Sequence, residues 1–269
     1  MNLSTAYYKS ILKKNISKEI VELLDEKVRQ YNHPLFIETD PVFVPHQYNR
    51  KEDIEIAGFL TATIAWGSRV SIIKNALRIM QLMDHAPFEF IMNHTHDDLK
   101  VFNGFVHRTF NSDDLKYFCK ALYHIYCNRG GMEKIFAKGL QPQSTQPAIH
   151  YFKKVFFSLP EAPLRTQKHI SDPMKGSAAK RLNMFLRWMV RNDRKGVDFG
   201  IWKSIKPAQL SCPLDVHSGN VARKLGLVNR KQNDAAAVNE LDNILRVLDP
   251  CDPVKYDFAL FGLGVFEKY

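Results

Sequence analysis

Apolar side chains recur along most of the chain at the three- and four-residue spacing of an α-helix, whereas the two-residue alternation of a β-strand is weak throughout. This spacing predicts a first helix over 17–31, with Ser17 as its N-terminal cap. A second helix is expected over 51–66, and it should be buried on most sides because it is mostly apolar. Further helices are expected over 70–80, 85–92, 113–127, 146–157, 178–192, 216–226, 234–248 and 256–266. The sequence therefore predicts an all-α protein.

Proline and glycine mark the connections between these helices. Residues 32–50 contain three prolines and are expected to form an extended connection. The residues WGSR at 66–69 end the second helix, and residues 171–177 place proline and glycine before the helix at 178–192. The chain contains no internal repeat and no low-complexity segment.

Positive charge is concentrated in one part of the chain. The net charge is +10, and residues 163–231 hold 15 basic and 4 acidic side chains, whereas the rest of the chain holds 23 basic and 24 acidic ones. A concentrated positive field most often serves a phosphate backbone, so we expect a nucleic-acid partner. The alternative is a solvated basic face without a partner. A membrane surface fits less well, because no segment pairs this charge with an exposed apolar face.

The apolar runs are shorter than the roughly 18 residues that a membrane span needs. The first 15 residues lack the long apolar stretch of a signal peptide. We therefore expect a cytoplasmic protein without membrane contact.

The cysteines carry no metal or disulfide pattern. Cys119, Cys127, Cys212 and Cys251 form no CxxC pair and have no histidine at zinc-finger spacing. Disulfides are rare in cytoplasmic proteins. We expect four buried thiols, no metal site and no cofactor.

Lys180 is the first candidate for chemistry. It lies on the first turn of the predicted helix 178–192, on the face that also carries Arg187 and Arg191. These cations would favour the neutral amine that a nucleophile needs. Gly176 and Ser177 belong to the preceding turn, where main-chain amides can face a phosphate. The alternative is an ordinary amphipathic helix whose basic face contacts water.

Asp215 is the second candidate. It precedes the predicted helix 216–226 and is well suited to cap it, which explains the residue without any catalysis. His217, Ser218 and Arg223 follow within two turns, and such donors near a helix N-terminus can form a phosphate site. The alternative is that they are solvated surface groups.

Two segments resemble a known family. The residues PLDVH at 213–217, followed by VARKLG at 221–226, resemble the signature of the helix-hairpin-helix–GPD superfamily of DNA base-excision glycosylases. Residues 179–183 (AKRLN) resemble the lysine-bearing helix of its bifunctional members, and the match is closest to the archaeal 8-oxoguanine DNA glycosylase branch. The chain also resembles a bacterial family of the same superfamily that has no assigned function.

The resemblance covers residues 54–83 and 171–266, and it does not extend to 84–170. Within the first part, Trp66, Ser68 and Arg69 fall where the loop that faces the minor groove lies. The hairpin differs from the usual Leu-Pro-Gly-Val-Gly, because residues 172–177 (DPMKGS) contain a single glycine. The four-cysteine cluster found at the C-terminus of some relatives is also missing from this sequence.

The resemblance implies two helical subdomains that flank a basic cleft. Residues 52–200 would form a six-helix-type domain with the hairpin and Lys180, and residues 1–51 and 201–269 would form the second helical domain. Trp66 or Phe185 would stack on a flipped base or fill the gap that it leaves, although both are also explained as core aromatics.

The implied function is a DNA base-excision glycosylase with abasic-site lyase activity, with an oxidised purine as the candidate substrate. Lys180 would be the nucleophile and Asp215 the catalytic carboxylate. The partner would be double-stranded DNA in the nucleoid, damaged or intact. Its phosphates would be contacted by main-chain amides at Gly176 and Ser177 and by the side chains of Arg187, Arg191, His217, Ser218 and Arg223. The alternatives are a non-catalytic DNA-binding protein that retains the fold and, with less support, an enzyme that acts on RNA or a free nucleoside.

Overall fold

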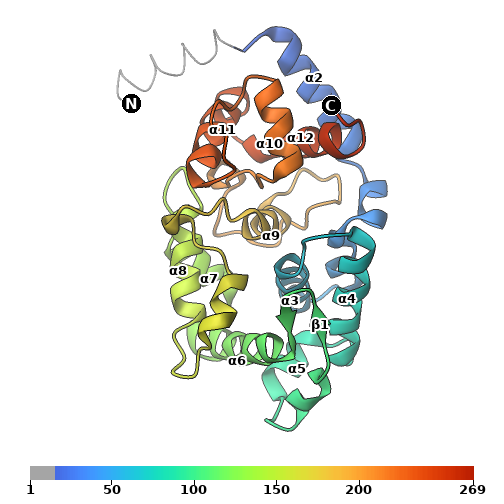
Figure 1. The fold of residues 1–269 in the computed structure, drawn as a ribbon, viewed down its shortest axis with the longest axis vertical. Helices are drawn as coiled ribbons and strands as arrows, with labels where there is room; N and C mark the ends of the chain where they lie inside the picture. The colour runs from blue at the N-terminus through green and yellow to red at the C-terminus, as the bar shows by residue number, and fades with distance from the viewer. Residues whose placement is uncertain (1–15) are drawn as a thin grey trace.

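The computed structural model describes residues 16–269, and these fold mostly into α-helices (Figure 1). The helices are α2 (Lys18–Tyr31), α3 (Lys51–Thr63), α4 (Arg69–Leu82), α5 (Pro87–Asn93), α6 (Ser112–Arg129), α7 (Met132–Lys138), α8 (Gln146–Phe156), α9 (Lys180–Val190), α10 (Val216–Lys224), α11 (Ala235–Leu248) and α12 (Tyr256–Val265). The strands β1 (Val106–His107) and β2 (Phe110–Asn111) form a short antiparallel hairpin. The predicted all-α class is confirmed.

Side-chain caps define where several helices begin. The hydroxyl of Ser17 accepts a hydrogen bond from the main-chain N–H of Ile20, as the sequence predicts for α2. Asn111 and Asp114 form a reciprocal capping box at the start of α6. Helix α3 is buried on all sides from Ile54 to Thr63, which agrees with its largely apolar sequence.

The predicted extended connection at 32–50 is wrong. The structure has three short 3-10 helices there: η1 (Pro34–Thr39), η2 (Pro41–Phe43) and η3 (Pro45–Gln47). Each begins with a proline, because proline supplies the helical φ at a position whose N–H has no helical partner. A helix of one or two turns is too short to produce a recognisable apolar period. Helix α7 and the β1–β2 hairpin were not predicted for the same reason.

Five further 3-10 helices connect the longer elements. They are η4 (Asp98–Phe102), η5 (Leu164–His169), η6 (Pro173–Lys175), η7 (Pro207–Gln209) and η8 (Pro253–Lys255). Of these, η6 lies immediately before α9 and shapes the turn that leads to Lys180.

The buried apolar side chains form two clusters. The larger is built on α3 to α9 and surrounds Phe59, whose ring contacts four other phenylalanines. The smaller combines Leu24 of α2 with α10, α11 and α12. Figure 1 shows α9 between the helices of the two clusters. The predicted domain limits at 52 and 200 differ from the cluster limits, because Val42 and Trp202 pack in the larger cluster.

Helix α9 is buried from Leu182 to Val190, and this overturns two predicted phosphate contacts. Arg187 and Arg191 are only 4% and 2% exposed. Arg187 pairs with Asp257 of α12 and, at 3.2 Å, with Asp198. The face that the sequence pattern assigned to water is covered by α12 and the loop after α9.

The guanidinium of Arg191 is likewise paired with carboxylates. It lies 3.1 Å from Asp198, 2.9 Å from Asp252 and 2.8 Å from Asp193. Neither arginine is available to a phosphate, so both contribute to packing between the two clusters. The basic segment 163–231 therefore presents less free positive charge than its composition suggests.

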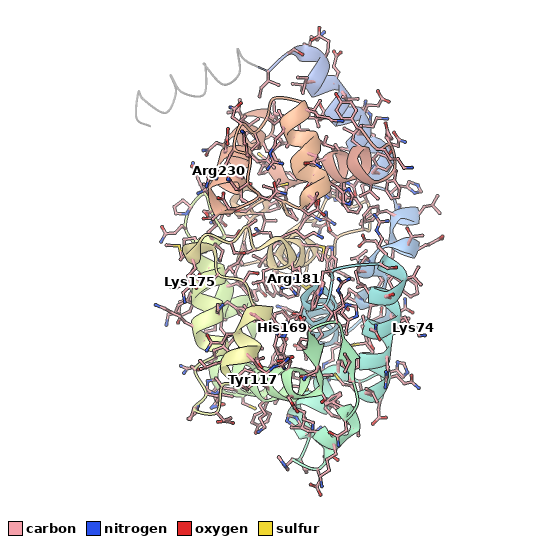
Figure 2. All side chains as sticks on the ribbon, in the orientation of Figure 1. Lys74, Tyr117, His169, Lys175, Arg181 and Arg230 are labelled. Carbon is pink, nitrogen blue, oxygen red and sulfur yellow. The ribbon has the colours of Figure 1, made fainter. Side chains whose placement is uncertain are left out.

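Other cationic side chains remain at the periphery. Lys74, Lys175 and Arg230 are exposed and point outward in Figure 2. None of the helices that the structure describes combines the length and the apolar character that crossing a membrane requires. Residues 1–15, on which the expectation about a signal peptide rests, lie outside the described residues.

The prediction of four buried thiols is half wrong. Cys119 and Cys212 are buried, whereas Cys127 and Cys251 are exposed, and all four are free thiols. Helix α6 turns Cys127 toward solvent, and Cys251 lies in the turn after α11.

Candidate active site

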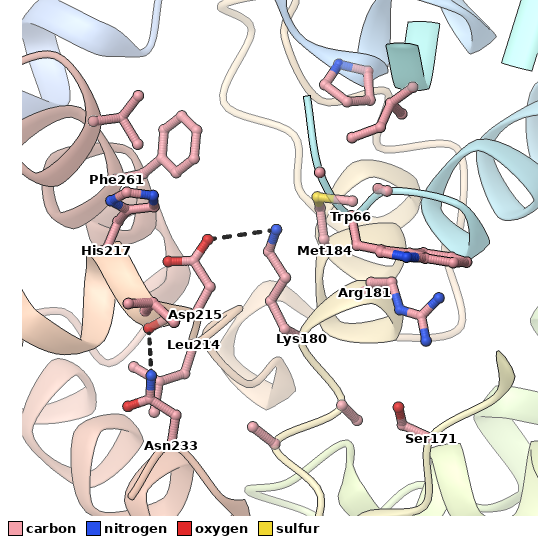
Figure 3. Close-up of a pocket in the computed structure, with 18 of the residues that line it drawn as sticks. Trp66, Ser171, Lys180, Arg181, Met184, Leu214, Asp215, His217, Asn233 and Phe261 are labelled. Carbon is pink, nitrogen blue, oxygen red and sulfur yellow. Dashed lines mark hydrogen bonds and ion pairs between the residues drawn. The ribbon is translucent and has the colours of Figure 1, made fainter. Parts of the chain in front are cut away.

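Lys180 and Asp215 meet at one cavity of about 660 Å³. The amine Nζ of Lys180 lies 3.5 Å from Oδ2 of Asp215, and their side chains are 29% and 21% exposed. Figure 3 shows the two side chains pointing toward each other. Lys180 is the first residue of α9, and Asp215 is the N-cap of α10. Two residues that are distant in the chain thus share a partly solvent-open pocket.

A capping box fixes the carboxylate of Asp215. Its Oδ1 accepts hydrogen bonds from the main-chain N–H and the hydroxyl of Ser218, at 2.9 and 3.1 Å. In return, the main-chain N–H of Asp215 donates to the hydroxyl of Ser218 at 2.9 Å. Because Oδ1 is used in this way, Oδ2 faces Lys180. The predicted cap is confirmed, but Ser218 is buried and directed at Asp215, so it is not available to a phosphate.

The electrostatic surroundings keep Asp215 ionised. Burial acts to raise the pKa of this carboxyl, but the Lys180 ammonium and the hydrogen bonds from Ser218 outweigh it and lower the pKa below its ordinary value. The site therefore holds an ionised carboxylate beside the side chain of Lys180.

The turn before Lys180 has a strained main chain and places this residue at the cavity. Ala179, directly before it, has φ 45°, and Gly176 has φ 90°. A left-handed conformation at a non-glycine residue costs about 1 kcal/mol or more, and such strain often occurs at functional sites. Asp172 stabilises the turn, since its Oδ1 accepts hydrogen bonds from Met174 N at 3.1 Å and from the ring of His150 at 2.9 Å.

The segment 233–235 connects the two sides of the site. Its Ala235 N–H donates to the carbonyl of Gly176 at 3.0 Å, in the turn before Lys180. Its Asn233 side chain donates to the carbonyl of Asp215 at 2.8 Å. Sequence reasoning did not find Asn233, because no periodicity or motif marks it.

Six of the ten predicted DNA-contacting residues lie in or beside the cavity. Trp66, Arg69, Ser177 and His217 line the cavity. Ser68 and Gly176 are exposed at its edge, next to lining residues.

Arg223 is turned away from the cavity. Its guanidinium donates to the carbonyl of Arg230 at 2.8 Å and to Asn233. Arg223 therefore stabilises the loop 230–233. The predicted contact between Arg223 and a phosphate at the cavity is wrong. Phe185 is fully buried in the larger cluster and cannot stack on a base. The prediction that named Phe185 beside Trp66 is corrected on this point.

Aromatic and cationic groups face each other around the cavity (Figure 3). On one side, the guanidinium of Arg181 lies 4.7 Å from the ring centroid of Trp66, and burial lowers the pKa of Arg181 to about 10. From the other side, Phe261 of α12 lies 4.8 Å from the guanidinium of Arg69. Arg181 and Phe261 were not predicted as site residues, although both lie within predicted helices.

Within residues 16–269, the structure has no group of three or more His, Cys, Asp and Glu side chains that could hold a metal ion. The cavity instead brings together the ion pair of Lys180 and Asp215 with further polar and charged side chains and a tryptophan. Such an arrangement can bind an anionic ligand and place an amine beside a proton acceptor.

Comparison with known proteins identifies the family but no activity. The family model described as "Protein of unknown function (DUF2400)" matches residues 40–266. The chain belongs to this family, because the match covers most of its length. Neither the comparison with curated proteins nor the comparison with solved structures found a match.

Proposed function

We propose that this member of the DUF2400 family is a DNA base-excision glycosylase with an associated abasic-site lyase activity. The observation that carries the proposal is the Lys180–Asp215 pair, 3.5 Å apart at a cavity of about 660 Å³. The resemblance of residues 213–226 to the glycosylase signature supplies the reaction class. A cavity of this size lies in the usual range for a small-molecule ligand, and a flipped nucleotide is one.

In the first step, Lys180 must become a neutral amine. The ammonium transfers a proton to the nearest acceptor, the carboxylate of Asp215. The electron pair on Nζ then forms a bond to C1′ of the flipped nucleotide while the bond between C1′ and the base nitrogen breaks. The base leaves with that electron pair and takes up the proton that Asp215 received from Lys180, which restores the carboxylate. The restored carboxylate stabilises the positive charge on the adduct between the amine and the sugar.

In the second step, the covalent intermediate breaks the strand. The amine nitrogen loses a proton, and its electron pair forms an iminium with C1′ while the bond between C1′ and the ring oxygen breaks. The ring oxygen takes up the proton. Loss of a proton from C2′ expels the 3′-phosphate, whose C3′–O bond breaks with its electron pair. Water then hydrolyses the iminium and restores Lys180. Asp215 is placed to move protons in each stage.

Double-stranded DNA is the proposed partner. Arg69 and His217 line the cavity on the side that faces solvent, and Lys175 is exposed on the turn before α9. Cations at these places would contact phosphates and so give affinity without base choice. An oxidised purine is the substrate suggested by the resemblance, and Trp66 and Phe261 are the aromatic side chains that line the cavity beside it.

Borohydride trapping tests the proposal. The wild-type protein is incubated with duplexes that contain 8-oxoguanine or an abasic site, and borohydride reduces any iminium to a stable adduct. We expect an adduct that maps to the peptide containing Lys180. It should be lost in Lys180→Gln and retained in Lys231→Gln, which removes an exposed lysine outside the cavity.

Two results would contradict the proposal. Duplex binding by the wild type without any adduct would favour the alternative, a non-catalytic DNA-binding protein with this fold. An adduct that persists in Lys180→Gln would show that another amine reacts. Circular dichroism of each variant would establish that the substitution left the fold intact.

A further inference from the structure

A second carboxyl side chain, beside that of Asp215, reaches the same cavity from a part of the chain that the proposed chemistry does not use. Asp40 is the N-cap of η2 and lines the cavity with Lys180 and Asp215, yet it is only 6% exposed. Its Oδ1 accepts a hydrogen bond from Val42 N at 3.0 Å. Within residues 16–269, no side chain or N–H donates to its second oxygen, Oδ2.

A buried carboxyl with an unused oxygen is unusual. Buried polar atoms nearly always have a hydrogen-bond partner, because leaving one without a partner forfeits its interaction with water without replacement. Asp40 borders the cavity, and its Oδ2 is not one of the fully sealed side-chain atoms without a partner. Its natural partner is therefore whatever occupies that space.

Structural ion pairing does not explain Asp40. Among the neighbouring cations, Arg187 lowers the pKa of Asp40 most, but its guanidinium is already paired with Asp198 and Asp257. Burial raises the pKa of Asp40 above its ordinary value, although Arg187, Arg69 and Lys180 act in the opposite direction. The carboxyl is thus held in a region from which water is largely excluded, where one added hydrogen bond has a large effect.

We infer that Oδ2 of Asp40 accepts a hydrogen bond from an N–H group on the edge of the nucleobase in the cavity, which makes Asp40 a residue that binds the flipped base. The inference rests on the proposed glycosylase function. An amino or imide N–H fits this oxygen, whereas a bare ring nitrogen or carbonyl would be repelled by it. Asp40 would therefore fix the orientation of a flipped base by the edge that carries its N–H donor.

The role of Asp40 differs from that of Lys180 and Asp215 in one testable respect. A preformed abasic site has no base, so Asp40 has nothing to recognise there. A substitution at Asp40 should slow removal of a base and leave the reaction of Lys180 with an abasic site unchanged. A purely structural role would affect both reactions or neither.

Asp40→Asn is the most informative variant. The N–H of Val42 should keep the amide oxygen in the place of Oδ1, so the cap is preserved and the NH2 group faces the cavity. An NH2 group would repel the N–H donor of the base. Asp40→Ser preserves the cap with no second polar atom and provides a variant without this repulsion. Asp53→Asn is the control, because Asp53 accepts from Phe88 N at 2.8 Å and does not line the cavity.

Two rates are measured for each variant: base excision from duplexes containing 8-oxoguanine, uracil or hypoxanthine, and borohydride adduct formation on an abasic duplex. For Asp40→Asn and Asp40→Ser we expect excision to fall about 10- to 100-fold, as for the loss of a hydrogen bond to a charged group. Adduct formation on the abasic duplex should stay within about twofold of the wild-type rate. Asp53→Asn should match the wild type in both.

The outcomes separate this inference from the function on which it rests. Normal excision by both Asp40 variants, or an equal loss of both rates in variants with wild-type melting temperatures, would overturn the role of Asp40 alone. A wild-type protein that excises none of the three bases would contradict the proposed glycosylase function itself and not the role of Asp40 alone. Failure of the wild type to form an adduct on the abasic duplex would also overturn the proposed function.

Discussion

The side-chain amide of Asn233 donates a 2.8 Å hydrogen bond to the main-chain oxygen of Asp215. The same asparagine packs against Gly219 so closely that a Cβ there would lie 2.5 Å from its Oδ1. Its neighbour Ala235 bonds to the turn before α9. Asn233 thus helps to set the distance between the amine of Lys180 and the carboxylate of Asp215 without touching either group.

Asn233→Ala should impair the reaction more than the fold. We expect the rate of adduct formation at saturating duplex to fall about 10- to 100-fold, because a small misplacement of reacting groups has effects of this size. The free energy of unfolding should fall by only about 1 kcal/mol. Single-turnover kinetics and urea unfolding measure the two quantities.

Asn229→Ala is the matched control for that experiment. The Asn229 side chain is exposed, and only its main-chain N–H is bonded, to Glu240 at 2.8 Å. The control should keep the wild-type rate. A rate for Asn233→Ala equal to that of the control would exclude a positioning role, as would a change in duplex affinity without a change in rate.

Asp215→Asn should alter the pH dependence of stability. The folded-state pKa of Asp215 is lowered, so its ionised form stabilises the protein above the unfolded-state pKa of about 3.9, and this contribution is lost as the pH falls through the folded-state value. The wild type should therefore be more stable than Asp215→Asn near neutral pH, and the difference should shrink below about pH 4.

Urea unfolding of both proteins between about pH 3 and about pH 7 measures this difference. Asparagine can still accept the hydrogen bond from Ser218, so the helix cap is conserved and the comparison isolates the charge. A difference that stays constant across this range would mean that the Lys180–Asp215 attraction contributes nothing to folding.

Arg187→Met should strongly destabilise the protein. The substitution keeps much of the side-chain volume but leaves Asp198 and Asp257 buried without their cation. Burial already raises the pKa of Asp257 to about 6 with Arg187 beside it. Removing one partner of a buried ion pair typically costs about 3–5 kcal/mol.

Equilibrium unfolding checks the size of this loss. Arg29→Met, at an exposed position in α2, should change stability by less than about 0.5 kcal/mol. If Arg187→Met were as stable as this control and instead bound DNA more weakly, the assignment of Arg187 to the interior would be wrong.

Trp66 should report on ligand binding by its fluorescence. The protein has three tryptophans, and Trp188 and Trp202 are buried in the larger cluster. Only Trp66 lines the cavity, so a duplex that inserts a base should change the emission of this residue. Titration of the wild type with an abasic-site or 8-oxoguanine duplex should give a saturable change that Trp66→Phe lacks. A full-sized change in Trp66→Phe would show that binding reaches the core instead.

The helices of this protein could largely be predicted from sequence. The apolar period located α2, α3 and α8, and the caps at Ser17 and Asp215 lie where the sequence places them. Helix α5 was also located, but α7, the 3-10 helices and the β1–β2 hairpin were missed, because such short elements contain too few residues to establish a period. The Lys180 and Asp215 segments were found by their local motif, which is short and continuous in the chain.

The direction in which α9 faces could not be predicted in the same way. A helical wheel shows that Arg187 and Lys180 share a face, but it does not show what lies against that face. In the structure, α12 covers one end with the carboxylate of Asp257, while the other end opens on the cavity. One basic stripe is therefore divided into a buried ion-pair network and a candidate nucleophile.

The sequence by itself determined the helical class, most helix positions and the two residues of the candidate pair, because each depends on contacts within a few residues. Only the tertiary structure decided that Arg187 points into the interior, that Asp40 reaches the cavity and that Asn233 supports Asp215. These relationships join segments far apart in the chain. They depend on how the two clusters pack, and local periodicity carries no information about that packing.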